Sequence, residues 1–140
     1  MQALESAGVA YALAGGLAVA IYATPRATED IDILLAPDHL ERTTACLGPL
    51  GYKGAGAPMR VAGGRMEIQR LIKIEGPDLL PVDLLLPGDP GLVGVLSDRR
   101  RIEWEGHPIS VVSAAGLRTL KRLRGSAQDA ADLEALGPEP

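Results

Sequence analysis

The sequence has no phenylalanine and few aromatic residues of any kind: one tryptophan and three tyrosines. Its core must therefore consist mainly of aliphatic side chains. Hydrophobic residues make up 46% of the chain and charged residues 23%, a balance typical of a globular protein and not of a disordered one. At 140 residues the chain is long enough to bury such a core, and we expect a single domain over residues 1–140.

Cysteine is nearly absent too, which limits both redox chemistry and metal sites. Cys46 stands alone, so no internal disulfide can form, and no cysteine and histidine cluster has the spacing of zinc ligands. A signal peptide would carry lysine or arginine near the N-terminus, where this sequence has Glu5. The longest uncharged apolar stretch, residues 9–23, is too short to span a membrane. We therefore expect a cytoplasmic protein with no membrane partner.

No strong excess of either charge is present. The chain has 14 lysines and arginines against 18 aspartates and glutamates, and this net charge of −4 argues against nucleic-acid binding through overall charge. A local basic patch is compatible with this balance. The densest basic run is Arg99, Arg100 and Arg101, which could contact an RNA acceptor, although a solvated turn is the simpler interpretation.

Glycine and proline divide the chain into short apolar segments, which together predict an α+β fold with a mixed β-sheet flanked by helices. Residues 66–75 alternate roughly between apolar and polar, as a half-solvated antiparallel strand does, whereas residues 80–87 are nearly all apolar, as in a central strand. The expected strands are residues 9–14, 30–36, 60–64, 66–75, 80–87 and 107–112. The expected helices are residues 2–7, 17–23, 37–51, 114–124 and 127–136.

The end of the chain, residues 114–137, predicts a short helical pair after a core of about residues 8–113. Serine accepts hydrogen bonds well at a helix N-cap, and glycine readily adopts the conformation that ends a helix. Each of the two helices has one of these residues at each end: Ser113 and Gly125 for the first, Ser126 and Gly137 for the second.

Two aspartates alternate with apolar residues in "TEDIDILL", residues 28–35. In a strand, Asp30 and Asp32 would point to the same face, where their like charges repel unless a cation lies between them. Asp83 in "LLPVDLLLP" is another acid in an apolar setting, and it can join the pair if its strand lies alongside. Carboxylates converging from two strands make an all-oxygen site, which favours Mg²⁺ or Mn²⁺ over zinc. Such ions support displacement at phosphorus.

A glycine pair precedes these carboxylates at an expected strand-to-helix corner. The backbone N–H groups of Gly15 and Gly16 and the positive end of the helix would face one spot there, as in phosphate-binding corners. The corner is not a P-loop, because no Gly-Lys-Ser/Thr follows, and it lacks the third glycine of a dinucleotide-binding fingerprint.

Each feature has a simpler interpretation when it is taken alone. An Asp-x-Asp pair is often a solvated strand end or a turn, a Gly-Gly pair is a weaker signal still, and Asp83 could pair with an arginine near a strand end. The order and spacing of the three features together favour the metal site.

"AGGLAVAIYATPRATEDIDILL" resembles the signature of the DNA polymerase beta-like nucleotidyltransferase superfamily, in which a glycine pair at a strand–helix corner precedes Asp-x-Asp and a later carboxylate. The resemblance is closest to the minimal bacterial branch that contains the AbiEii-type abortive-infection toxins. That branch has a small-residue helix and an Arg-x-Thr-x-Asp-x-Asp run, here Arg26, Thr28, Asp30 and Asp32. "VDLLL" and the tail "LRTLKRLRGSAQDAADLEAL" are also similar to it.

The resemblance implies a role for each matched residue. Asp30 and Asp32 would hold the metal ions, and Asp83 would complete the site and help to activate the attacking hydroxyl. Gly15 and Gly16 would contact the nucleotide phosphates.

Two residues ahead of the carboxylates leave alternatives open. Arg26 could bind a phosphate, or it could form an ion pair with Glu29 or Asp30. Thr28 could hydrogen-bond the nucleotide or the loop itself, and the second role is the simpler one.

The first helix of the tail combines an apolar stripe with a basic face. The stripe is Leu117, Leu120 and Leu123, and the basic residues are Arg118, Lys121, Arg122 and Arg124. The basic face could simply be solvated, it could contact an RNA acceptor, or Lys121 could reach a triphosphate with Arg124 beside it. In the next helix, Asp129 and Asp132 suit the first turns, where acids stabilise the helix dipole.

These observations lead to one main hypothesis and two alternatives. The main hypothesis is a metal-dependent nucleotidyltransferase that transfers NMP from an NTP such as ATP to a hydroxyl of an acceptor and releases pyrophosphate. The acceptor could be tRNA, protein or a small molecule, and a toxin role would add an antitoxin partner. The first alternative is an inactive nucleotide- or partner-binding module of the same fold. The second is a sugar-nucleotide glycosyltransferase, but those chains are much longer and lack the glycine corner.

Overall fold

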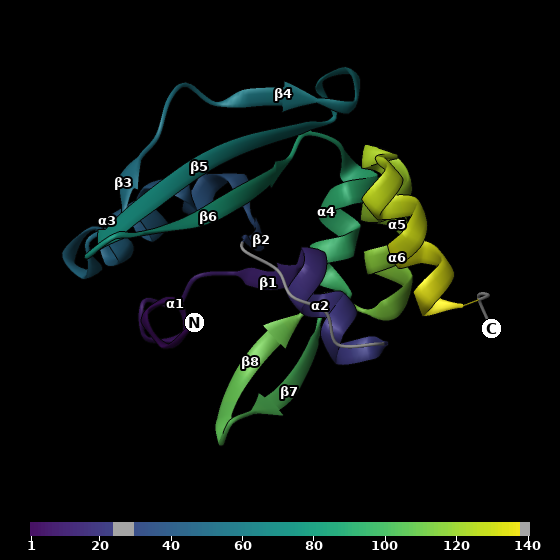
Figure 1. The fold of residues 1–140 in the computed structure, drawn as a ribbon, viewed down its shortest axis with the longest axis horizontal. Helices are drawn as coiled ribbons and strands as arrows, with labels where there is room; N and C mark the ends of the chain where they lie inside the picture. The colour runs from purple at the N-terminus through teal and green to yellow at the C-terminus, as the bar shows by residue number, and fades with distance from the viewer. Residues whose placement is uncertain (24–29, 138–140) are drawn as a thin grey trace.

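A computed structural model of the chain describes residues 1–23 and 30–137, which form a mixed sheet with helices on both faces (Figure 1). The strands are β1 (Tyr11–Ala14), β2 (Ile31–Leu35), β3 (Lys53–Gly54), β4 (Met59–Val61), β5 (Met66–Glu75), β6 (Asp78–Pro87), β7 (Arg100–Trp104) and β8 (His107–Val111). The helices are α1 (Gln2–Ser6), α2 (Gly15–Tyr22), α3 (Leu40–Leu47), α4 (Pro90–Ser97), α5 (Ala114–Arg124) and α6 (Ala127–Leu136). Three short 3-10 turns complete the described elements: η1 (Pro37–His39), η2 (Gly48–Leu50) and η3 (Ala62–Gly64).

The strands lie in the order β3-β5-β6-β2-β1-β8-β7, and β4 pairs with β5 beside this path. Strand β2 runs parallel to β6, β1 runs parallel to β8, and the remaining pairs are antiparallel. The mixed sheet predicted from the sequence is therefore confirmed. Strand β6 lies between β5 and β2, so its nearly continuous apolar sequence does belong to a central strand, and β5 is antiparallel to it as predicted.

Apolar side chains fill both faces of the sheet. On one face, α2, α4 and α6 all contact α5, and Leu117 of α5 is fully buried within that core. On the other face, Leu4 of α1 and Leu47 of α3 pack against Val82 and Leu84 of β6. Figure 1 shows the two groups of helices apart, with α4, α5 and α6 together on one side of the view. The face covered by α5 also carries the acidic residues described below.

The helical tail follows the predicted caps. The Ser113 hydroxyl accepts a hydrogen bond of 3.0 Å from the Gly116 N–H at the start of α5, and Gly125 ends that helix with φ +67°. Ser126 and Asp129 form a capping box at the start of α6, in which each side chain bonds the other residue's backbone N–H. These local signals set both helix boundaries at the expected residues.

Several segments differ from the sequence-based expectation. Helix α4 and strands β3 and β7 were not predicted, although Asp89 caps α4 by accepting a hydrogen bond of 2.9 Å from the Leu92 N–H. The helix expected over residues 37–51 is shorter, because α3 is flanked by the turns η1 and η2. The expected strand at residues 60–64 ends at Val61, because Gly63 and Gly64 take positive φ and form a turn.

The basic run at residues 99–101 is not a solvated turn, since β7 begins at Arg100. Arg100 lies 3.0 Å from the Asp98 carboxylate, and Arg101 lies 2.8 Å from that of Glu5. Both arginines therefore already have acidic partners. Separately, no helix in the described part of the chain is long and apolar enough to cross a membrane.

Candidate functional site

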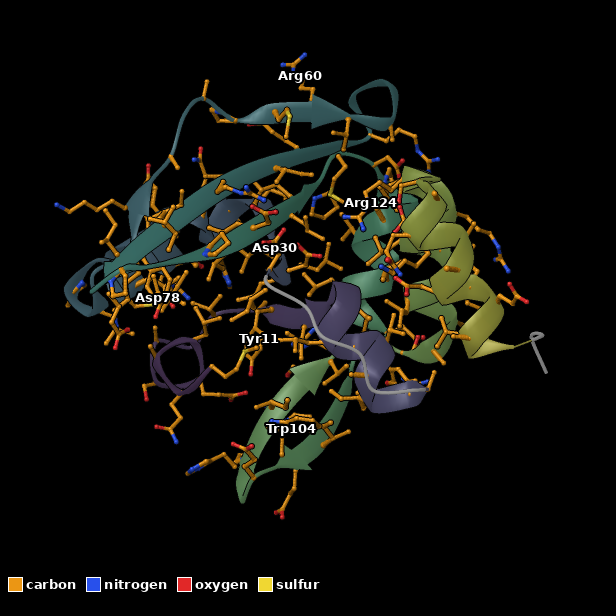
Figure 2. The ribbon with its side chains drawn as sticks, in the orientation of Figure 1. Tyr11, Asp30, Arg60, Asp78, Trp104 and Arg124 are labelled. Carbon is orange, nitrogen blue, oxygen red and sulfur yellow. The ribbon has the colours of Figure 1, made fainter. Side chains whose placement is uncertain are left out.

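One row of charged side chains crosses the sheet on the face covered by α5. Asp32 of β2 is in parallel register with Asp83 of β6, and Arg70 of β5 is paired with Asp83 on the other side. Residues directly opposite each other on neighbouring strands point to the same face. Arg70, Asp83 and Asp32 therefore stand side by side. Asp30, which comes just before β2 and is labelled in Figure 2, lies 3.4 Å from the Arg70 guanidinium.

The cation between the carboxylates is Arg70. Its Nε lies 2.7 Å from Asp83 Oδ1 and its Nη2 lies 2.9 Å from Asp83 Oδ2, a two-pronged contact that the planar guanidinium makes well. The same Nη2 lies 3.4 Å from Asp30 Oδ2. The hydrogen bonds that Arg70 donates to Asp83, and the negative charges of Asp83, Asp30 and Asp32, raise the pKa of the Arg70 guanidinium.

Arg70 is not among the site residues predicted from the sequence, although the sequence holds a signal for it. Met66, Ile68, Ile72 and Ile74 occupy alternate positions of β5, and Arg70 interrupts that series. A charged residue at an apolar position of a strand indicates a charged partner on the facing strand. Asp83 is that partner, in the middle of β6 and not at its end.

Asp32 is the most buried carboxylate of the row, with 7% of its surface exposed. Burial raises its pKa, and the neighbouring negative charge of Asp83 raises it further. The positive charges of Arg124 and Lys121 oppose this shift without cancelling it. Ionisation of Asp32 therefore costs more free energy in the folded protein than in water.

The backbone of Gly15 lies directly against the Asp32 side chain. It begins α2 directly after β1, as the glycine pair predicts, and the first turn of α2 has no side-chain cap. Gly15 has φ +65°, and a Cβ atom at this position would overlap the Asp32 carboxylate. Only glycine meets both requirements, the positive φ and the close approach.

The cost of the close approach can be separated from the cost of the positive φ by comparison with Gly8, which has a similar φ. Gly8 has φ +68°, but a Cβ atom there would meet no atom within 4 Å. Gly15→Ala is expected to lower the free energy of unfolding by about 1–3 kcal/mol more than Gly8→Ala does, the usual cost of overpacking. Urea unfolding of the two variants measures the difference. Equal losses would show that Asp32 does not press on Gly15.

The basic face of α5 is not solvated throughout, which corrects the simpler expectation. Lys121 is 3% exposed, and its Nζ lies 3.2 Å from Asp129 Oδ1 and 2.9 Å from Asp132 Oδ2. Arg118 is 7% exposed and donates a hydrogen bond of 3.0 Å to the Leu136 carbonyl. The two aspartates therefore join α6 to α5 through Lys121, in addition to the helix-dipole role expected from the sequence.

Arg124 is the basic residue of α5 that reaches both Asp129 and solvent. Its Nε and Nη2 each lie 2.8 Å from an Asp129 oxygen, and 47% of its side chain is exposed (Figure 2). Arg124, Asp32 and Gly15 line one cavity of about 50 Å³ between α5 and the sheet. The rest of its lining is mostly apolar and includes Met66, Ile68, Leu85, Leu117, Leu120 and Leu123.

Comparison with known proteins identifies the fold. No family model matches the sequence, and no curated protein matches it. Solved structures do match: the lincosamide antibiotic adenylyltransferase LnuA, bound to lincomycin, has a TM-score of 0.62 at 17% identity, over 95% of this chain and 89% of that one. The chain has the nucleotidyltransferase fold.

Two further structures with this fold match over nearly the whole chain. TM1012 of Thermotoga maritima, whose assignment as a nucleotidyltransferase is provisional, has a TM-score of 0.66 at 15% identity, over 95% of this chain and 84% of that one. The antibiotic-resistance factor ANT(2'')-Ia has a TM-score of 0.57 at 14% identity, over 96% of this chain and 83% of that one. At these identities the likeness concerns the nucleotidyltransferase fold alone.

The donor set has the chemistry of a hard cation site. Asp32 and Asp83 offer carboxylate oxygens side by side, which suit Mg²⁺ or Mn²⁺. Within the described residues, no three acidic, histidine or cysteine side chains are grouped closely enough to enclose an ion. The Arg70 guanidinium contacts both Asp30 and Asp83 and so lies between the two carboxylates. The two remaining residues predicted here, Arg26 and Thr28, lie outside the described residues.

Proposed function

We propose that this protein is a metal-dependent nucleotidyltransferase that transfers NMP from an NTP to a hydroxyl group and releases pyrophosphate. The observation that carries the proposal is the parallel register of Asp32 and Asp83, directly beside the Gly15 corner. Arg70 pairs with Asp83, whereas the more buried Asp32 lies beside a second negative charge. A buried acid with a raised pKa beside a second acid is typical of a functional site.

Asp32, Asp83 and Asp30 would hold Mg²⁺ or Mn²⁺ once the Arg70 guanidinium moves off Asp83 and Asp30. The ion would neutralise phosphate charge and keep the α-phosphorus aligned for in-line displacement. The backbone N–H groups of Gly15 and Gly16 would bind phosphate oxygens, as uncapped helix starts do.

The chemical step forms one bond and breaks one at phosphorus. The acceptor oxygen attacks the α-phosphorus, and the bond from that phosphorus to the bridging oxygen breaks, so pyrophosphate leaves. Asp83 would accept the hydroxyl proton. Most of the rate acceleration would come from positioning and from stabilised charge, as is usual for transfer at phosphorus.

We assign the triphosphate contact on α5 to Arg124 in preference to Lys121. Lys121 is buried and already paired with two carboxylates, whereas about half of the Arg124 side chain is exposed beside the cavity that Asp32 lines. Arg26 and Thr28 stay predictions for the nucleotide.

Small hydroxylated molecules are the acceptors that we would test first. Two of the matching structures are an antibiotic adenylyltransferase and an antibiotic-resistance factor. The burial of Arg118 and Lys121 reduces the basic surface of α5 that an RNA acceptor could contact, and Arg100 and Arg101 have acidic partners. The AbiEii-like branch, with a tRNA or protein acceptor and an antitoxin, stays a prediction.

The proposed reaction is tested by incubating the protein with each α-³²P-labelled NTP, Mg²⁺ or Mn²⁺, and panels of hydroxylated small molecules, tRNA and protein. Transfer of label to an acceptor, together with pyrophosphate release in equal amount, is the expected result. Metal-dependent binding of NTP without any release across all panels would favour the inactive binding module instead.

A further inference from the structure

Arg70 takes the oxygen atoms that a metal ion would need. Its guanidinium contacts both oxygens of Asp83, at 2.7 and 2.9 Å, and also reaches Asp30 at 3.4 Å. Only 13% of the Asp83 side chain is exposed, so few other directions of approach to this carboxylate are open. Magnesium and manganese also bind carboxylates through oxygen lone pairs, and the guanidinium already uses one on each Asp83 oxygen. Because the rest of Asp83 is hard to reach and the guanidinium is positive, it competes with an incoming cation for this carboxylate.

The Arg70 side chain could move away from Asp83 without any change in the sheet. The backbone of Arg70 is fixed, because β5 and β6 pair without a break from Met66↔Pro87 to Glu75↔Asp78. Its side chain is not fixed in the same way, since 44% of it is exposed. Rotation about the side-chain bonds would move the charged end into solvent and leave the sheet unchanged.

We propose that Arg70 and a divalent cation are alternative occupants of the Asp30 and Asp83 carboxylates, so that Arg70 holds the empty site together and must swing out when the ion binds. The inference rests on the proposed function. It makes Arg70 a positioning residue that lowers the affinity for a free ion. An ion that arrives with a nucleotide brings phosphate oxygens as extra ligands, so it competes better with Arg70 for the carboxylates.

The variant Arg70→Gln removes the competing cation. It is expected to bind Mn²⁺ roughly tenfold more tightly than the wild type in the absence of nucleotide, the scale of a charge-assisted bidentate contact. Electron paramagnetic resonance of free Mn²⁺ measures this affinity without any turnover. Arg60→Gln is the matched control, because Arg60 is exposed on the adjacent strand β4 and its loss changes the net charge equally.

Arg70→Lys distinguishes two explanations of tighter Mn²⁺ binding in Arg70→Gln: loss of the contact with Asp83, or loss of a positive charge near the site. Lysine keeps the positive charge but cannot make the two-pronged contact with Asp83. If Arg70 must be displaced, Arg70→Lys should bind Mn²⁺ more tightly than the wild type and less tightly than Arg70→Gln. An affinity for Arg70→Lys equal to that of the wild type would overturn the inference, since charge alone would then explain Arg70→Gln.

A second readout follows Arg70 in the wild-type protein. In protein labelled with ¹⁵N-arginine, the Nε–H signal that is missing from Arg70→Lys belongs to Arg70. This signal should move toward the position of a solvated arginine as Mg²⁺ is added. A signal unchanged at saturating Mg²⁺ would overturn the inference.

The outcomes also separate this inference from the proposed function. If the wild type binds Mn²⁺ and Arg70→Gln binds it equally, the proposed metal site stands and the role of Arg70 is wrong. If neither protein binds Mn²⁺ at millimolar concentration, with or without NTP, both the metal site and the role of Arg70 are wrong.

Discussion

Asp32→Asn is expected to lower nucleotidyl transfer by at least about 10³-fold, the scale of losing a group that stabilises charge in the transition state. The same change should raise the free energy of unfolding by about 1 kcal/mol, as removal of a strained functional group commonly does. Asparagine keeps the shape of the side chain against Gly15, but it removes a buried negative charge that Asp83 repels. Loss of function with a gain in stability is the signature of a functional carboxylate.

The gain in stability should depend on pH in a defined direction. Because burial and Asp83 raise the pKa of Asp32 in the folded protein, folding is penalised at neutral pH, where the group is charged. As the pH falls through the raised pKa, the folded wild type takes up a proton and the penalty fades. Below the ordinary value of 3.8 the advantage of Asp32→Asn should be gone.

Unfolding curves at several pH values, together with the labelled transfer assay, test both parts of this prediction. Asp78→Asn is the control, since Asp78 is exposed at the far end of the β5–β6 hairpin (Figure 2). It should leave activity and stability unchanged. Full activity in Asp32→Asn would rule out the metal role of this residue, and a loss of stability at neutral pH would show that its charge has a structural partner.

Lys121→Met is expected to lower the free energy of unfolding by about 3–5 kcal/mol, as the removal of one partner from a buried ion pair does. The variant would leave Asp129 and Asp132 buried, at 0% and 2% exposed, without the lysine that joins them. Methionine fills a similar volume, so lost packing contributes little. Arg124 would still form its ion pair with Asp129. The ion pair between Lys121 and Asp132 would be lost.

Thermal and urea unfolding measure this effect, and Arg122→Met is the matched control. Arg122 follows Lys121 on α5 but is exposed, so its replacement should change stability by less than about 0.5 kcal/mol. Equal effects of the two changes would show that the buried lysine does not join α6 to α5.

Low pH should weaken the contact between α5 and α6 that Asp129 makes. Burial acts to raise the pKa of Asp129, but hydrogen bonds from Arg124 and Ser126 prevail and hold it well below its usual range. The stabilisation from Asp129 is therefore present at neutral pH and is lost as the pH falls through that lowered pKa.

Local signals in the sequence predicted much of the fold. Period-two alternation marked β5, and Ser113, Gly125 and Ser126 marked the ends of the tail helices, because cap geometry depends on residues close together in the chain. The convergence of Asp32 and Asp83 also followed from one assumption, that their strands are neighbours.

The partners of charged residues were harder to predict, because they depend on contacts between distant segments. Arg70 meets Asp83 through the register of a hairpin of two ten-residue strands, and a shift by one residue would turn Arg70 to the other face. For Lys121 the sequence left open a solvated face, an RNA contact and a triphosphate contact, but it did not predict burial. The two acids that permit a buried lysine there are supplied by the packing of α6.

The central claim is that Asp32 belongs to a metal-dependent nucleotide site. Its most direct test is calorimetric titration of each NTP into the wild type and Asp32→Asn, with and without Mg²⁺. The account predicts that the wild type binds at least one NTP only when Mg²⁺ is present, and that Asp32→Asn does not. Binding of an NTP that needs no Mg²⁺, or that survives in Asp32→Asn, would contradict it.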